Sequence, residues 1–414
     1  YNPCMTRTRD ELAAETAPSV KAPLWTRDYI LACCANLMTG LAFYELVPVL
    51  PLYLTGQLQA SSGCLGWIMS IYVLDAIISR PWFAHRVYTG DRKKIYITVY
   101  IMLALSFSGY AAAATALAFF LTRFIQGLIW GGMTTSGPTM AVDIIPPARR
   151  GEGLGFFGMT MTLGMCLGPV IGLQVYQQYG FYVITWSSLL LCLAGAGIAS
   201  LIRVPRSPVQ EPVYETPKKV LDRLVLRVGI PLAVNVMIAT FSYGVVAVYS
   251  ALYGEMHGFK YAGLFYALMG LGMLVSRFMV GRQIDRGRVA ELSVISLRIL
   301  TVSFGALALA PLEWIYYASA ILIGFGFGIF IPTFQTMKLN MADRGHRGAV
   351  NSTFFTAFDI GVGTGMFLGG KIYAYLNLNW AFGTGALLNL LAIVYFYRIS
   401  LDHYRKNKLG VDSD

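Results

Sequence analysis

The chain has 414 residues, of which 56% are hydrophobic and only 13% are charged. Soluble domains carry roughly a quarter of charged residues, so this composition and its mean hydropathy of +0.58 exclude an ordinary soluble protein and indicate many membrane-spanning helices. The net charge of +11 does not indicate a nucleic-acid partner, because the basic residues gather in alternate loops, as the positive-inside rule describes. We therefore expect a multi-pass protein of the inner (plasma) membrane with both termini in the cytoplasm.

Apolar stretches near the roughly 20-residue spanning length predict an all-α protein with twelve transmembrane helices. A cytoplasmic tail (1–27) precedes an N-terminal half of six helices (28–203). A polar, proline-bearing segment (204–225) is typical of a linker, and a C-terminal half of six helices (226–400) and a basic cytoplasmic tail (401–414) follow. The expected helices lie near 28–54, 64–86, 95–116, 118–143, 152–174, 181–203, 226–253, 261–282, 291–310, 314–339, 348–373 and 379–400.

The two halves of the chain repeat at an offset of 197 residues. Three independent motifs share this spacing, which makes a chance match unlikely and indicates a duplicated six-helix unit. They are Ser79-Arg80 and Ser276-Arg277 (276 − 79 = 197), Arg150-Gly151 and Arg347-Gly348 (347 − 150 = 197), and the triplets Gly164, Gly168, Gly172 and Gly361, Gly365, Gly369. Such a repeat predicts two pseudo-symmetric halves around a central cavity, as in transporters that work by alternating access.

The glycines of the first triplet lie on one face of their expected helix, because they recur every four residues. A face without side chains lets a neighbouring helix approach at backbone contact. Pro169, which has no counterpart in the second half, loosens the turn before it. We expect the face of Gly164, Gly168 and Gly172 to pack against a helix of the opposite half, with 261–282 as its partner.

Four charged residues fall inside apolar stretches and have no counterpart of the same charge in the other half: Glu45, Asp75, Arg123 and Asp359. A charge near the bilayer centre costs at least about 2.5–3.5 kcal/mol, so such residues pair, face a cavity, or handle protons or substrate. We interpret the acids as candidate proton sites, because a dry site favours the neutral form of a carboxyl. Arg123 is expected to contact Glu45, with Asp75 as the alternative. The competing interpretation is a buried ion pair that only stabilises the packing.

Four segments give the chain, from about residue 28 to 400, a resemblance to the major facilitator superfamily, in its twelve-helix drug/proton antiporter branch. They are Gly164-xxx-Gly168-Pro169-xx-Gly172, similar to the helix 5 motif of exporters; Arg123-Phe-Ile-Gln126-Gly127, similar to the helix 4 motif; Gly281-Arg-Gln-Ile-Asp285-Arg286-Gly287-Arg288, similar to the gate loop between helices 8 and 9; and Glu45-xx-Pro48-xx-Pro51, similar to a helix 1 signature of some multidrug members. The resemblance implies proton coupling through Arg123 and a cytoplasmic gate at the loop that contains Asp285.

The sequence departs from the family pattern at the cytoplasmic end of the second helix. Ala84 and Tyr88 stand where the family has a glycine and an aspartate. Asp91 and Arg92, in the same loop, are then the candidate gate residues on this side. Arg80, just before this loop, is expected to extend its charge to the membrane surface or to hold the loop.

The combined features predict a proton-coupled exporter of a small lipophilic or drug-like compound. A transporter of a polar metabolite, sugar or siderophore is the alternative, for which Asn36, Gln126, Gln335 and Asn351 would supply polar cavity groups. A receptor or enzyme on a transporter scaffold is a remote alternative, because no nucleophile–base pair, metal cluster or phosphate loop is found. We expect no cofactor or metal, and a monomer whose partners are its substrate, protons and the lipid bilayer.

Overall fold

The apolar stretches fold into helices, which satisfy every backbone polar group within one segment, as a lipid environment requires. The computed structural model describes residues 23–146, 149–204, 227–309, 312–341 and 347–408. Every regular element in these ranges is helical. Nearly all of the expected N-terminal tail and linker, and the end of the C-terminal tail, lie outside the described residues.

The helices agree with the expected ones to within a few residues at most ends. The N-terminal half contains α2 (Arg27–Tyr44), α3 (Val49–Gly56), α4 (Ser62–Thr89), α5 (Arg92–Ala112), α6 (Ala116–Ile144), α7 (Arg150–Tyr179) and α8 (Phe181–Ser200). The C-terminal half contains the short η2 (Arg227–Gly229), α10 (Ile230–Met256), α11 (Leu264–Asp285), α12 (Val289–Leu309), α13 (Glu313–Leu339), α14 (Arg347–Tyr375), α15 (Leu378–Tyr395), the π-helical turn η4 (Phe396–Ser400) and α16 (Leu401–Asn407).

Eleven helical stretches in the described part of the chain are long and apolar enough to cross a membrane. The remaining long helix, α14, has 29 residues and would extend roughly 43 Å. It packs between α10 and α4. It is rich in glycine and carries Asp359 and Lys371, which lower its apolar character. With α14 included, the helices match the twelve expected from the sequence.

The first expected helix is broken into α2 and α3, a feature that the sequence analysis did not predict. Residues 45–48 form a turn between the two pieces. Pro48 and Pro51 explain the break, because each lacks the N–H that would continue the backbone hydrogen-bond ladder. Glu45 is the C-cap residue of α2, so its side chain leaves the chain at an interruption of the helix.

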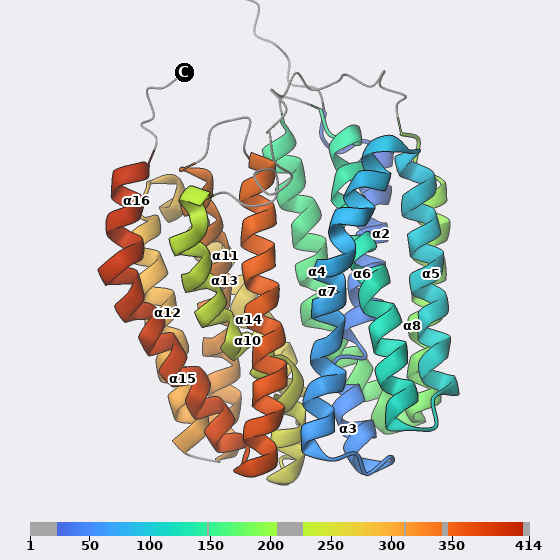
Figure 1. Ribbon diagram of the computed structural model, residues 1–414, viewed down its shortest axis with the longest axis vertical. Coiled ribbons are helices and arrows are strands. Elements are labelled where there is room, and N and C mark those ends of the chain that lie inside the picture. The colour runs from blue at the N-terminus through green and yellow to red at the C-terminus, as the bar shows by residue number, and fades with distance from the viewer. Residues whose placement is uncertain (1–22, 147–148, 205–226, 310–311, 342–346, 409–414) are drawn as a thin grey trace, which may run out of the picture.

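The helices form two bundles that lie side by side (Figure 1). The blue-to-green elements, α2 to α8, make one bundle, and the yellow-green-to-red elements, α10 to α16, make the other. Two helix pairs contribute most of the contact between the bundles: α4 with α14 and α7 with α11.

The internal contacts of one bundle recur in the other at the 197-residue offset. A Cβ placed on Gly131 of α6 would overlap the Ser79 hydroxyl of α4, and a Cβ placed on Gly328 of α13 would overlap the Ser276 hydroxyl of α11. The two pairs are equivalent, since 131 + 197 = 328 and 79 + 197 = 276. Both serines donate back to a carbonyl one turn earlier in their own helix. The duplication seen in the sequence is therefore also a duplication of packing.

The glycine face of α7 packs against α2 of the same half, so the expectation of a partner in the opposite half was wrong. A Cβ on Gly164 would lie 2.6 Å from the backbone of Gly40, and one on Gly168 would lie 2.9 Å from the amide nitrogen of Glu45. Gly172 meets the carbonyl group of Glu45. The missing side chains thus allow α7 to contact the broken end of α2 at backbone distance.

Other small residues make the contacts between the halves. A Cβ on Gly66 of α4 would lie 2.7 Å from the Phe367 carbonyl oxygen and 3.3 Å from the Gly370 Cα, both on α14. A Cβ on Gly270 of α11 would lie 2.5 Å from the Cβ of Cys166 on α7. Helix α7 therefore does contact α11, but through a face that carries Cys166 and not through its glycine triplet.

We predict that Gly172→Ala destabilises the protein, because the added methyl group would press on backbone atoms that cannot move aside cheaply. Overpacking of this kind costs about 1–3 kcal/mol. Gly158, also in α7, is the control, since a Cβ there would meet nothing within 4 Å and alanine favours the helix. Thermal unfolding of the purified protein should show a lower Tm for Gly172→Ala and an equal or higher Tm for Gly158→Ala. A wild-type Tm for Gly172→Ala would show that this contact does not constrain the fold.

Candidate functional site

Glu45 lies at the α2–α3 break and is bound by hydroxyl groups. The residue is 1% exposed. Ser188 of α8 donates to Glu45 Oε1 at 2.5 Å, and Ser187 donates to the same oxygen at 3.3 Å. No ion pair of Glu45 occurs among the residues that the structure describes. Neutral donors can serve either protonation state of a carboxyl, since a hydroxyl can donate or accept.

Asp75 lies on the side of α4 that faces α6, and it is 2% exposed. Its Oδ2 atom has no hydrogen-bond partner within the described ranges. Gly127 of α6 leaves the space for this carboxyl, because a Cβ at position 127 would lie 2.9 Å from the Asp75 Cβ. A buried polar atom without a partner is costly, so Asp75 is a functional candidate on physical grounds.

Arg123 of α6 is 1% exposed and contacts neutral groups. Its Nη1 donates to Gln126 Oε1 at 2.7 Å and to the Tyr110 hydroxyl at 3.4 Å. Its guanidinium carbon lies 4.2 Å from the centre of the Tyr72 ring, a distance that suits a cation–π contact. Its Nε and Nη2 atoms have no hydrogen-bond partner in the part of the chain that the structure describes. The expected contact with Glu45 or Asp75 was therefore wrong for this conformation.

Arg123 and Asp75 nevertheless occupy the same pair of facing helices, about one helical turn apart. Tyr72 and Asp75 share a face of α4, because residues three apart lie above one another. Arg123 stacks on Tyr72, and Gly127, one turn further along α6, approaches Asp75. A buried cation and a buried acid with unsatisfied atoms thus lie near each other without pairing.

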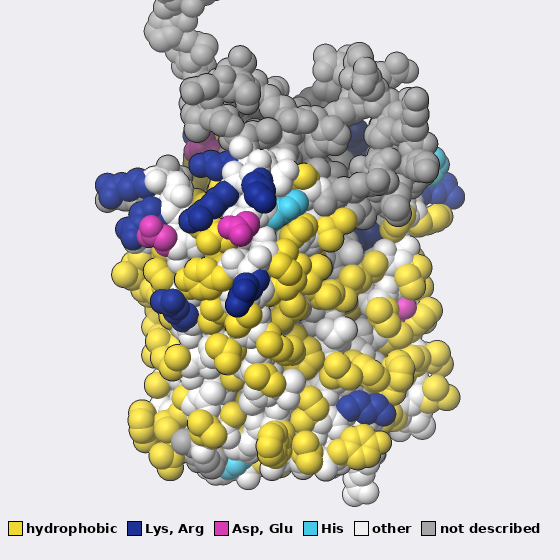
Figure 2. Space-filling view, turned by 60° about the vertical axis from the view of Figure 1, so that its left-hand side comes forward, with side chains coloured by type: hydrophobic (Ala, Val, Ile, Leu, Met, Phe, Trp, Pro, Cys, Tyr) yellow, Lys and Arg dark blue, Asp and Glu magenta, His cyan; other side chains and the backbone are white. Residues whose placement is uncertain are grey.

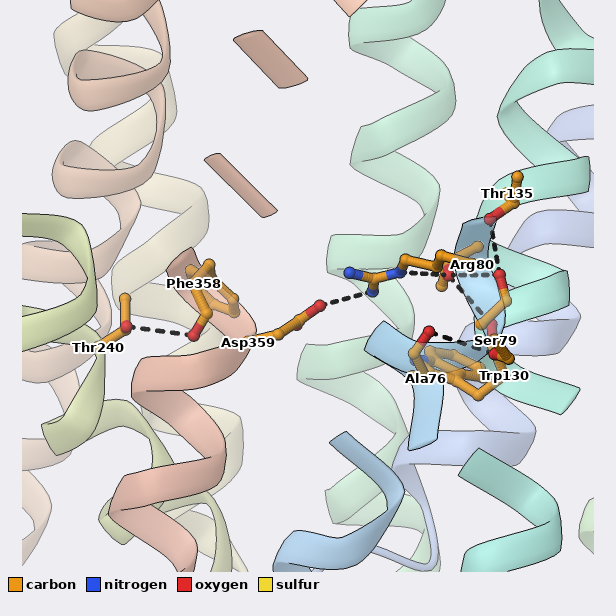
Figure 3. A network of polar contacts seen from close by, with 10 residues as sticks. Ala76, Ser79, Arg80, Trp130, Thr135, Thr240, Phe358 and Asp359 are labelled. Atoms are coloured by element: carbon orange, nitrogen blue, oxygen red, sulfur yellow. Dashed lines mark hydrogen bonds and ion pairs between the residues drawn. The ribbon is translucent and has the colours of Figure 1, made fainter. Parts of the chain in front are cut away.

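Arg80 and Asp359 form an ion pair between the two halves. Arg80 Nη2 of α4 lies 2.5 Å from Asp359 Oδ2 of α14, and the two side chains are 22% and 23% exposed. Figure 3 shows Arg80 extending from one half to Asp359 on the other. The Thr240 hydroxyl of α10 donates to the carbonyl of Phe358 at 3.2 Å and so holds the turn of α14 that carries the acid. The expectation that Arg80 extends to the surface or holds a loop was wrong.

The symmetry-related position of this ion pair has no acid. Asp359 corresponds to Thr162 (359 − 197), and Arg80 corresponds to Arg277 (80 + 197). Arg277 Nε has no hydrogen-bond partner. Within the described residues, the two halves are therefore joined by charge at the α4–α14 contact and not at the α7–α11 contact.

Aromatic rings surround these charges on both halves. In the N-terminal half, Phe43 stacks on Trp130 with ring centres 3.8 Å apart. In the C-terminal half, Tyr243 meets Phe327 edge to face at 5.0 Å and Phe358 at 5.7 Å. Clustered rings with few polar atoms form the kind of surface on which a flat or greasy molecule can bind.

Lys338, on α13, is a buried charge that the sequence analysis missed. It is 0% exposed, and its Nζ has no hydrogen-bond partner among the described residues. Nζ lies 5.3 Å from the centre of the Phe354 ring of α14. The signal that could have found it is its spacing of four and eleven residues from Phe334 and Phe327, which places it on the same apolar helix face.

The expected gate residues have local roles where the structure describes them. Asp91 caps α5 by accepting the backbone N–H of Lys94. Arg92 forms an ion pair with Asp143 of α6. Arg288 pairs with Glu291 of α12. Gly281 has open space around it and Arg286 is exposed, whereas the side chain of Asp285 lies outside the described residues.

The expected polar cavity groups are only partly available. Asn36 donates to the Phe157 carbonyl and to the Thr160 hydroxyl of α7, so it joins two helices of one half. Gln126 accepts from Tyr110 and Arg123. Gln335 is partly buried and has a partner. The side chain of Asn351 is not among those described.

Comparison with known proteins identifies the family of this chain. A family model described as "Major Facilitator Superfamily" matches residues 32–361 and 263–413. A multidrug resistance protein, MdtG of Serratia proteamaculans, is 26% identical over 396 residues, which are 92% of this chain and 95% of that protein. The staphylopine export protein of Staphylococcus aureus is 21% identical over 360 residues, 83% of this chain and 89% of that protein.

Solved structures show the same fold. A bacterial homologue of the human lysosomal transporter Spinster, in an inward-facing and occupied conformation, aligns with a TM-score of 0.73 and 13% identity over 92% of this chain and 98% of that one. The nucleoside transporter NupG aligns with a TM-score of 0.71 and 12% identity over 90% of this chain and 98% of that one. The match of the family model along almost the whole chain, on this two-bundle fold, means that the protein belongs to the major facilitator superfamily of transporters.

Proposed function

We propose that this transporter is a proton-driven exporter of small lipophilic compounds that works as a monomer in the inner membrane, with both termini in the cytoplasm. The observation that carries the proposal is the pattern of charge in the bundle interior. One acid, Asp359, pairs with Arg80 across the halves, while Asp75 and Arg123 retain buried atoms without partners. A conformational change that is coupled to charge requires one ion pair that can break, here Arg80–Asp359, and another that can form, here Arg123–Asp75.

The Arg80–Asp359 pair gives the proposed coupling a physical basis. Alternating access separates contacts between the halves on one side of the membrane, and the α4–α14 contact is one of the two principal ones. Separation would leave each charge, in a site that is only partly exposed, without its counter-ion, which is unfavourable. A proton on Asp359 removes one of the two charges and weakens the attraction, so proton binding would favour separation of α4 from α14.

Asp75 and Arg123 supply a second element of the proposal. A change in the tilt of α4 against α6 could bring the free Arg123 nitrogens to the free Asp75 oxygen, because the two lie about one turn apart on facing helices. Arginine suits such an exchange of partners, since its planar group offers five donors. Glu45, bound by two serine hydroxyls, is the remaining candidate proton site in this half.

The aromatic surfaces and the relatives support a lipophilic substrate. The rings of Phe43, Trp130 and Tyr243 offer flat apolar area, and buried acids nearby favour a positively charged compound. Multidrug resistance proteins are among the relatives. Lys338 favours a second candidate, a substrate with a carboxylate, since a buried ammonium without a partner would attract an anionic group. A staphylopine export protein is also among the relatives.

We expect the carboxyl groups of the N-terminal half to be necessary for uphill transport. Asp75→Asn and Glu45→Gln keep the shape and polarity of each side chain but remove the titrating group. In proteoliposomes with an imposed pH gradient, at least one variant should lose accumulation of a lipophilic cation yet still equilibrate it downhill. Glu313→Gln, at the exposed start of α13, is the control and should transport normally.

Full gradient-driven accumulation by both variants would remove these acids from the coupling mechanism. The second candidate substrate class would instead be supported if the wild type accumulates an anionic test compound but not the cation, and if Lys338→Met abolishes this accumulation.

The charges of Arg80 and Asp359 are predicted to depend on each other for stability. Arg80→Gln or Asp359→Asn alone leaves an unpaired charge, whose cost reaches about 3–5 kcal/mol at a fully buried site and less here, because the side chains are 22% and 23% exposed. The double variant removes both charges and should melt above at least one single variant. Additive losses of Tm in the double variant would contradict this coupling.

The Arg92–Asp143 pair, whose arginine side chain is 38% exposed, provides the matched control. The same cycle with Arg92→Gln and Asp143→Asn should give a coupling of at most about 1 kcal/mol, as surface pairs do.

A further inference from the structure

A groove of about 380 Å³ lies on the outer surface of the C-terminal half, between α12 and the η4–α16 segment. Its walls are mainly apolar and include Val294 of α12, Phe396 of η4 and Leu401 of α16. Two arginines, Arg298 and Arg405, also line it. Figure 2 shows the side of the molecule that carries α16: basic side chains gather above a broad hydrophobic belt, and some lie within its upper part.

The groove carries uncompensated positive charge. Arg298 and Arg405 are exposed, and neither has an ion pair or hydrogen-bond partner among the described residues. The acid in the lining, Glu291, is already engaged, because Arg288 donates two hydrogen bonds to it at 2.9 and 2.7 Å. The groove therefore offers two free guanidinium groups to an anion.

Arg298 lies near the middle of the candidate membrane-spanning helix α12 and not at its end. It is the tenth residue of α12, which begins at Val289, so it lies roughly 14 Å along the helix axis from that end. A second, smaller hollow of about 240 Å³ begins at the same arginine and continues along Ile299, Val302 and Leu322. Its lining beyond Arg298 is entirely apolar. The two hollows share Arg298: the larger one also contains Arg405, and the smaller one continues as an apolar surface.

The π-helical turn η4 shapes this groove. The backbone N–H of Leu401 bonds to the Phe396 carbonyl, five residues back, and π-helical turns are rare and often occur at functional sites. Beyond the turn, α16 is anchored on its inner side: His403 Nε2 lies 2.7 Å from the Val228 carbonyl, and Asn340 donates to the Tyr404 hydroxyl at 3.1 Å. Leu401 and Arg405, four residues apart, share the side that lines the groove.

We propose that this groove is a binding site for an anionic phospholipid of the leaflet in which the first turns of α12 and the helix α16 lie. The phosphate lies between Arg298 and Arg405, whose forked donors match phosphate oxygens, and an acyl chain follows Val302 and Leu322. The occupant is a lipid and not a free phosphate ion, because most of the lining is apolar and the smaller hollow offers nothing polar beyond Arg298. The lining residues of the groove belong to α12, η4 and α16 and not to α4 or α14, which carry the Arg80–Asp359 pair, so the site does not depend on the proposed transport mechanism.

The test is retention of lipid by the purified full-length protein, measured by native mass spectrometry in detergent with added phosphatidylglycerol or phosphatidylcholine. The wild type is expected to retain phosphatidylglycerol preferentially. Each arginine near a membrane surface contributes roughly a fivefold factor to such binding, so Arg298→Gln with Arg405→Gln should weaken retention roughly 30-fold. The matched control removes two exposed charges of the same region that do not line the groove, Arg398→Gln with Lys406→Gln, and should retain the lipid as the wild type does.

A second variant keeps the test decisive if the double arginine variant fails to fold. Val302→Trp fills the apolar hollow and leaves both arginines in place, so it should also lower phosphatidylglycerol retention. The proposal is overturned if phosphatidylcholine is retained equally well, if the control loses as much lipid as the arginine variant, or if Val302→Trp and the arginine variant both bind like the wild type. Equal competition by soluble glycerol phosphate would assign the groove to a free anion and would also overturn it.

Discussion

Most of what this structure can do depends on one requirement, that a charge placed among apolar helices is costly unless it has a counter-ion or a proton. Arg80 and Asp359 meet the requirement by pairing across the two halves. The pair makes the closeness of α4 and α14 a matter of electrostatics as well as of packing. Because a proton can replace the counter-ion of a carboxylate but not of a guanidinium, only one member of the pair can respond to the proton gradient.

The duplicated scaffold makes the placement of these charges informative. Gly131 packs on Ser79 in one half as Gly328 packs on Ser276 in the other, so neighbouring helices within each half approach each other with the same geometry. The charges do not follow this symmetry: Asp359 and Arg80 meet at α4–α14, while the equivalent Arg277 has no acidic partner at α7–α11 within the part of the chain that the structure describes. Separating α4 from α14 therefore requires breaking an ion pair, whereas separating α7 from α11 does not, so the two contacts between the halves can differ in the free energy of opening.

The helices, the repeat and the family could be predicted from the sequence because each leaves a local or periodic signal. Apolar length predicts spans, and a fixed offset of 197 residues predicts a duplicated unit. The contacts of single side chains could not be predicted. The stripe of Gly164, Gly168 and Gly172 shows which face of α7 is bare but not which helix covers it, and the answer was α2.

The partners of the buried charges were hidden for a related reason. Whether Arg123 meets Glu45 depends on the rotation of α2 and α6 about their axes, which composition and spacing leave open. Arg80 was judged by its distance from the end of its helix, whereas its partner, Asp359, lies 279 residues further along the chain (359 − 80 = 279). The burial of Lys338 could not be predicted, because a single lysine near a helix end usually extends its ammonium group to water. The roles assigned to Glu45, Asp75 and Arg123 remain predictions.

The backbone contacts between α7 and α2 have a consequence for how the chain assembles. These contacts and their counterparts between α14 and α10 lie inside single halves, so each six-helix unit holds its own closest-fitting surfaces. Each unit can therefore reach its final shape in the membrane before the two dock, as domains commonly do. Docking then forms mainly the α4–α14 and α7–α11 contacts, and these can be remade in every transport cycle while the interiors of both units stay intact.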